Sequence, residues 1–132
     1  MNLKFLIAVT ATLIITGCKK KKEDAPPAPA VVGYWEGKYS DGNAVPDLSY
    51  FFLFRSNGTV RVYADDADTV AAGKAEGTYI VNGNTVKTTY TYAPSTSYST
   101  QAIVDAGFAT MEGTWGSGAN VSGNGTFRIF KK

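Results

Sequence analysis

The stretch AEGTYIVNGNTVKTTYTY, residues 75–92, decides the fold class of this chain. Two runs rich in threonine, valine, isoleucine and tyrosine stand on either side of Asn82-Gly83. β-Branched and aromatic residues suit a pleated strand, and Asn-Gly tolerates the positive φ that a type I′ hairpin turn requires. The sequence therefore predicts an antiparallel hairpin whose strands are Ala75–Val81 and Thr85–Tyr92.

Similar runs recur at short intervals from Gly33 onward, and no apolar 3.6-residue periodicity persists beside them. Asn57-Gly58 gives a second hairpin signal, and the short links favour an up-and-down meander over a Greek key. We therefore predict an all-β domain: a single antiparallel up-and-down meander of about eight strands that forms a small barrel. The remaining predicted strands are Tyr34–Ser40, Leu48–Arg55, Thr59–Ala64, Tyr98–Val104, Ala109–Trp115 and Gly125–Phe130.

A short motif, Glu-Gly-x-aromatic, occurs in three of these strands, beginning at Glu36, Glu76 and Glu112. Gly125-Thr126-Phe127 is a partial fourth copy. Residues i and i+2 of a strand share a face, so each glycine lies beside a large ring while the glutamate faces the other way. Glycine permits sharp coiling and leaves room for a neighbouring ring, as a small closed barrel requires. The rings then either line a cavity or fill the barrel as a packed core.

The run LSYFFLF, residues 48–54, is apolar on both faces. One face of a single-layer barrel must look outward, so this strand is either covered by a neighbouring segment or exposes an apolar patch for a partner. Alternation places Tyr50, Phe52 and Phe54 on one face and Phe51 and Leu53 on the other.

The N-terminal residues have the pattern of an exported protein. A short basic start precedes Phe5–Ile15, an uncharged apolar run that is shorter than the ~20 residues of a membrane-spanning helix and fits an export signal. Ile15-Thr16-Gly17-Cys18 then resembles the lipobox of bacterial lipoproteins, in which small residues admit the peptidase and the thiol accepts the lipid. We expect residues 1–17 to be a cleaved signal peptide and Cys18 to carry a palmitate-type lipid anchor.

Residues 18–30 are predicted to be a tether to the membrane. Lys19–Lys22 can lie against anionic head groups, and the proline-rich part that follows should be extended. The residue after Cys18 is lysine, not aspartate, which the lipoprotein sorting rule associates with the outer membrane. Lys22-Glu23-Asp24 resembles the surface-export signals of Bacteroidota lipoproteins, or it is an ordinary solvated spacer. We therefore expect a lipid-anchored protein of the outer membrane, on its periplasmic face or on the cell surface.

Charge and composition argue against several functions for the remaining domain, residues 31–132. The whole chain has a formal net charge of +2, but from Val31 onward eight basic residues face nine acidic ones. No basic face remains, so we expect no nucleic-acid partner. The chain has no histidine, which removes Ser-His-Asp and Cys-His catalysis.

Carboxylates are the remaining candidates for chemistry. Glu36, Glu76 and Glu112 could converge as in a glycosidase, but strand alternation turns them away from the rings. Asp65-Asp66-Ala67-Asp68 lacks the glycine and the distal glutamate of an EF-hand loop. We therefore expect no catalytic residues, no metal site and no cofactor.

The order of motifs over about a hundred residues, from Val31 to Phe130, resembles the small lipocalin-like lipoproteins of Bacteroidota, within the broader calycin group. An avidin-like barrel is similarly compatible. The lipocalin resemblance implies that Trp35 closes the barrel floor and packs on Arg128 through a cation–π contact. The motifs that carry the resemblance are Gly33-Tyr34-Trp35-Glu36-Gly37, Ser56–Val60, Gly77–Tyr79, Val81–Thr85 and Gly113–Gly116.

Three functions compete at this point. The first is a non-catalytic binding module for a small apolar or glycan ligand, since both lipids and sugar faces stack on rings. The second is an envelope protein that binds another protein, as an inhibitor or structural subunit, through the outer side of Leu48–Arg55. The third is an enzyme, which would need carboxylates that converge in a cleft. The candidate ligand-binding residues of the first are Trp35, Tyr50, Phe52, Tyr90 and Trp115.

Overall fold

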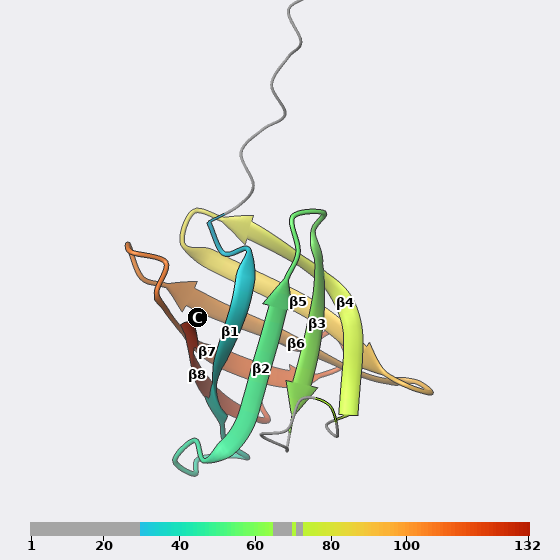
Figure 1. Ribbon diagram of the computed structural model, residues 1–132. Helices are drawn as coiled ribbons and strands as arrows, with labels where there is room; N and C mark the ends of the chain where they lie inside the picture. Colours follow the sequence, from blue (N-terminus) through green and yellow to red (C-terminus); the bar gives the residue numbers. More distant parts are fainter. Residues whose placement is uncertain (1–29, 65–69, 71–72) are drawn as a thin grey trace, which may run out of the picture.

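The computed structural model describes residues 30–64, 70 and 73–132, which form a closed eight-stranded antiparallel barrel (Figure 1). Each strand pairs with the next along the chain, and pairing of the first strand with the last closes the barrel. The predicted all-β meander is confirmed, and every observed strand begins and ends within about two residues of a predicted one. The strands are β1 (Gly33–Tyr39), β2 (Leu48–Phe54), β3 (Thr59–Ala64), β4 (Gly73–Asn82), β5 (Thr85–Tyr92), β6 (Thr96–Val104), β7 (Thr110–Ser117) and β8 (Gly125–Lys131).

Both predicted hairpins form, but the predicted turn type is wrong. β2 pairs with β3 and β4 pairs with β5, as the two Asn-Gly dipeptides indicate. A type I′ turn needs positive φ at both central residues. Here Gly58 (φ +81°) and Gly83 (φ +61°) have positive φ, whereas the asparagines before them do not. The β4–β5 link is Gly83-Asn84, so glycine takes the first central position.

The glycines of the repeated motif lie where neighbouring backbones come very close. A Cβ atom at Gly37, Gly77 or Gly113 would lie 2.0, 1.9 or 2.2 Å from a backbone carbonyl oxygen of a neighbouring strand. Only glycine can occupy such positions without moving a strand. The motif glycines therefore support tight packing of the barrel strands, as predicted. The space left by the missing side chain is occupied mainly by the backbone of a neighbouring strand and not by a ring.

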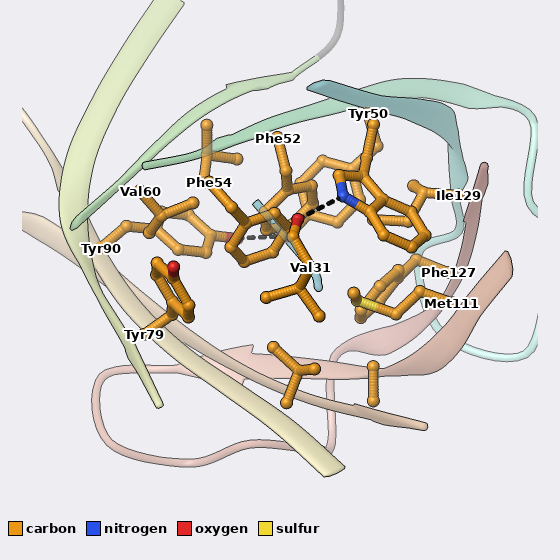
Figure 2. Packing of buried hydrophobic residues seen from close by; sticks show 14 of the residues in the cluster. Val31, Tyr50, Phe52, Phe54, Val60, Tyr79, Tyr90, Met111, Phe127 and Ile129 are labelled. Atoms are coloured by element: carbon orange, nitrogen blue, oxygen red, sulfur yellow. Dashed lines mark hydrogen bonds between the residues drawn. The ribbon is translucent and has the colours of Figure 1, made fainter. Parts of the chain in front are cut away.

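The barrel interior is a packed aromatic core (Figure 2). Phe52 is 1% exposed and packs on Phe54 and Phe127, with ring centroids 5.6 and 5.9 Å away. The ring of Phe54 meets that of Tyr79 edge-on at 5.0 Å. The interior of an eight-stranded barrel is just wide enough for inward-facing side chains to fill it. These rings therefore occupy the interior as a packed core.

The chain enters the barrel at the end where β1 begins and β8 ends, called here the near end. Val31 is 0% exposed, and its carbonyl oxygen accepts a hydrogen bond of 2.8 Å from the indole Nε1 of Trp35 (Figure 2). The Lys131 ammonium donates to the Ala30 carbonyl oxygen at 2.6 Å and lies 5.9 Å from the centroid of the Trp35 ring. Val31, two residues before β1, thus closes the near end with its own side chain.

The predicted cation–π contact between Trp35 and Arg128 is wrong. Trp35 points inward, whereas Arg128 alternates with the inward Phe127 and Ile129 and so points outward. The Arg128 guanidinium lies 5.3 Å from the Phe130 ring centroid on the outer face. Lys131, and not Arg128, is the cation that lies over Trp35.

Candidate functional site

The five predicted ligand-binding residues do not form one site. Tyr50, Phe52 and Tyr90 lie together in the interior, where Phe52 meets Tyr50 at 4.6 Å and Tyr90 at 6.2 Å between ring centroids (Figure 2). Trp115 lies beyond them, towards the end of the barrel that carries the β1–β2, β5–β6 and β7–β8 loops, called here the far end. Trp35 lies at the near end and is fully buried. The structure therefore removes Trp35 from any site shared with Trp115.

Aromatic side chains gather at the far end in what we call the far-end cluster. Their ring centroids lie 5.0 to 6.2 Å apart, a spacing at which edge-to-face and tilted pairs attract one another. The contacts lead from Trp115 to Tyr39 (5.6 Å) and to Tyr98 (5.6 Å), so rings from three different strands meet at this tryptophan. The cluster consists of Tyr39, Tyr50, Tyr90, Tyr92, Tyr98 and Trp115.

Burial within the far-end cluster falls from its base to its rim. Tyr50 and Tyr90 are each 3% exposed, whereas Tyr92, Tyr98 and Trp115 are only half-buried. The Trp115 indole Nε1 donates a hydrogen bond of 2.9 Å to the Ser40 carbonyl oxygen, which fixes the ring while part of it stays open to solvent. The rim therefore offers fixed, partly exposed aromatic surface at one end of the barrel.

The two phenols at the base are joined by a short hydrogen bond between the hydroxyls of Tyr50 and Tyr90. Burial raises the pKa of Tyr50 well above its usual range, and burial likewise raises that of Tyr90. Both groups are therefore neutral at physiological pH. These two phenols can stack and form hydrogen bonds, but at physiological pH neither is a phenolate that could act as a nucleophile or a base.

Sequence reasoning missed three members of the far-end cluster: Tyr39, Tyr92 and Tyr98. A signal for each was present in the sequence. Tyr39 and Trp115 are the aromatic residues of two copies of the Glu-Gly-x-aromatic motif. Tyr92 follows Tyr90 at i+2 and so shares its face, and Tyr98 is the cross-strand partner of Tyr90.

The outer face of β2 is mostly covered. Phe51 points outward yet is only 8% exposed, because the Tyr34 ring stacks on it at 6.1 Å with an interplanar angle of 7°. The apolar side chain that stays open beside it is Phe130, which is 44% exposed. Phe51 and Phe130 line a shallow hollow of about 400 Å³ whose charged edge includes Lys38 and Lys132.

The three motif glutamates point outward as predicted, and each forms an ion pair with a base. Glu36 pairs with Lys132, and Glu112 with Arg128 at 2.8 Å. Glu76 pairs with Arg55 at 2.9 Å and also with Arg61. The hydrogen bond from Arg55 lowers the pKa of Glu76, so this carboxylate stays ionised and is unsuited to act as a general acid at neutral pH.

Among residues 30–64, 70 and 73–132, no three His, Cys, Asp or Glu side chains gather in a group that could hold a metal ion. The acidic run Asp65–Asp68 lies outside the described residues, as do Cys18, the predicted signal and most of the tether. In the part of the chain that is described, no helix is long and apolar enough to cross a membrane. Comparison with protein-family models and with curated proteins finds no match to this chain.

Proposed function

We propose that this protein is a lipid-anchored, non-catalytic binding module of the cell envelope that holds a glycan against the far-end cluster. The observation that carries the proposal is the set of contacting rings at one barrel end, with Trp115, Tyr98 and Tyr92 partly exposed at its rim. Sugar faces stack on such rings.

The packed interior favours a glycan over an apolar ligand. A lipid chain needs a dry cavity to enter, and ligand sites of that kind measure roughly 300 Å³ or more. Phe52 and Phe127 occupy the space between the two ends, and Phe52 is 1% exposed. A sugar needs only the outer surface of the rim, which is available without moving the core.

The position at which the chain enters the barrel supports this use. Ala30 and Val31 lie at the near end, held by hydrogen bonds to Lys131 and Trp35. The far-end cluster lies towards the other ends of these strands, where the β1–β2 and β7–β8 links lie. A chain anchored through Cys18 would therefore hold its aromatic rim away from the membrane, towards soluble or polymeric glycans.

A protein partner on the outer face of β8, β1 and β2 is the second candidate. The exposed ring of Phe130 and the hollow beside Phe51 favour it. A pull-down from envelope extracts with wild type and a Phe130→Ser variant would test this function. Identical sets of captured proteins would remove this face from consideration.

The two tryptophans make a direct test of the glycan proposal possible. Trp35 is fully buried at the near end, whereas Trp115 is partly exposed in the far-end cluster. We would titrate full-length protein, purified in a polyoxyethylene detergent, with neutral oligosaccharides and follow tryptophan emission. Trp115→Phe leaves only the buried reporter, and Trp35→Phe is the matched control that leaves only the rim reporter.

We expect the emission of wild type and Trp35→Phe to change with added sugar, and Trp115→Phe to lose both the emission change and most of the affinity measured calorimetrically. Acrylamide should quench Trp115 more than Trp35 before any sugar is added. A sugar response that survives unchanged in Trp115→Phe would place the ligand elsewhere. No binding across a broad glycan panel would contradict the proposed function.

A further inference from the structure

A second surface with the features of a binding site lies on the outside of the barrel, away from the far-end cluster. A groove of about 630 Å³ lies over the outer faces of β4, β5 and β6, with the β7–β8 loop as its wall. A hollow of about 350 Å³ adjoins it, and both are lined by Ile80 and Lys87. The two hollows share these two residues, so they form one continuous, shallow track on the outer surface of the barrel.

The wall of the groove is held rigidly against the sheet. The Gly118 amide donates to the Ser97 carbonyl oxygen at 2.8 Å, and the Ser99 hydroxyl donates to the Gly118 carbonyl oxygen at 2.7 Å. The Thr114 hydroxyl donates to the Val121 carbonyl oxygen at 2.7 Å. These bonds fix the loop before any ligand arrives, which lowers the entropic cost of binding.

The lining of the groove is neutral except for one cation. Its exposed floor carries the hydroxyl groups of Thr78 and Thr89. Ser99 lies beneath them, 2% exposed, and its hydroxyl is hydrogen-bonded to Thr89 and Gly118. Among the residues that the structure describes, no acidic side chain lines either hollow. The cross-strand neighbours of Lys87 are Ile80 and Gln101, so its ammonium has no carboxylate directly opposite. Such a site suits a ligand with many hydroxyls and one negative charge.

The topology argues against a peptide in this groove. Extended peptides commonly bind by adding a strand to a free sheet edge. Here β4, β5 and β6 are paired on both sides, within a barrel whose eight strands are all paired in a closed ring. Recognition must therefore come from side-chain hydroxyls, amides and the ammonium, which match the groups of a sugar acid.

We propose that this groove binds an acidic oligosaccharide, with a uronate carboxylate against the Lys87 ammonium and sugar hydroxyls against the Thr78 and Thr89 side chains. This site goes beyond the proposed function and does not depend on it. The carboxylate–ammonium contact is exposed, so it should contribute at most about fivefold in affinity.

The test uses full-length protein in a polyoxyethylene detergent and measures calorimetric binding of oligogalacturonates and of their carboxyl-reduced counterparts. Wild type should prefer the acidic chain by about fivefold. Lys87→Gln should remove that preference. Lys74→Gln is the matched control, because Lys74 is an exposed lysine of β4 that lines neither hollow. Thr89→Phe, which fills the groove from an exposed position, should weaken both ligands.

Three results would overturn the inference. They are equal affinity of wild type for the acidic and the carboxyl-reduced oligosaccharide, a loss of the acidic preference in Lys74→Gln as large as in Lys87→Gln, and binding of a hexaglutamate peptide as tight as that of the acidic oligosaccharide. Trp115→Phe separates this site from the far-end cluster, and it should leave the preference for the acidic chain unchanged. A lost preference in Trp115→Phe would place the acidic chain at the far end instead. Equal thermal unfolding of all variants checks that each one folds.

Discussion

Replacing Gly77 by alanine should destabilise the barrel strongly, although alanine ordinarily stabilises a strand relative to glycine. The added Cβ would lie 1.9 Å from the Thr89 carbonyl oxygen and 2.6 Å from the Tyr90 Cα. An ordinary carbon contact needs about 3.5 Å, so β4 and β5 must separate by more than an ångström. Overpacking costs about 1–3 kcal/mol when side chains can move, and here only backbone can move. We expect a loss of at least about 3 kcal/mol.

Gly73→Ala is the matched control in the same strand, because its Cβ would meet only the Tyr92 ring at 3.7 Å. Alanine there should be neutral or stabilising by up to about 1 kcal/mol. Urea and thermal unfolding of both variants would measure the difference, with the urea m-value checking that the barrel still unfolds as one unit. Equal stability of Gly77→Ala and wild type would refute the claim that the motif glycines exist for close backbone approach.

Further predictions concern the near end, the buried phenols and the anchor. Val31→Ala should cost about 2–3 kcal/mol in thermal unfolding, since it empties a fully buried site, whereas Val45→Ala at an 82% exposed position should stay within about 0.5 kcal/mol. The raised pKa values of Tyr50 and Tyr90 mean that their contribution to stability is complete below pH ~10 and lost at higher pH. Phenolate absorbance from the buried pair should therefore appear only as the barrel unfolds, and its appearance in a folded barrel near pH 10 would contradict this. Mass spectrometry of the native product should find residues 1–17 removed and acyl mass on Cys18, and an intact N-terminus would refute the anchor.

The strand pattern could be predicted from sequence because it depends on local signals. Runs of β-branched and aromatic residues separated by turn dipeptides define each strand, and short links leave a meander as the simplest way to pair them. The geometry of the turns could not be predicted as well from the sequence. The two Asn-Gly dipeptides indicate a hairpin correctly, yet positive φ is confined to Gly58 and Gly83, because the strands end at different positions from those the dipeptides suggest.

The candidate site was harder to predict, because it depends on register and on which end of the barrel a ring reaches. Alternation gives a side chain's face but not its height along the barrel axis, so Trp35 and Trp115 looked equivalent when they lie at opposite ends. Alternation alone could have corrected one expectation. Phe127 and Ile129 are apolar and inward, which turns Arg128 outward and leaves the inward Lys131 to cover Trp35.

A packed interior limits how tightly this barrel can bind an apolar ligand. Admitting such a ligand would require a ring such as Phe52 to leave the core, and losing a buried phenylalanine costs about 3–5 kcal/mol. That cost would weaken binding by roughly a hundredfold to a few thousandfold. Surface recognition at the far-end cluster or the outer groove avoids the cost but gives modest affinity at each site.

Modest single-site affinity would suit a protein that the proposed lipid anchor concentrates on a membrane. A polymeric ligand can engage neighbouring copies at once, and each further contact is then made at a high effective concentration. The proposed anchor would in this way supply affinity that the packed barrel cannot. Removing the anchor should therefore weaken binding of a long glycan far more than binding of a single short oligosaccharide, whose affinity depends on one barrel alone.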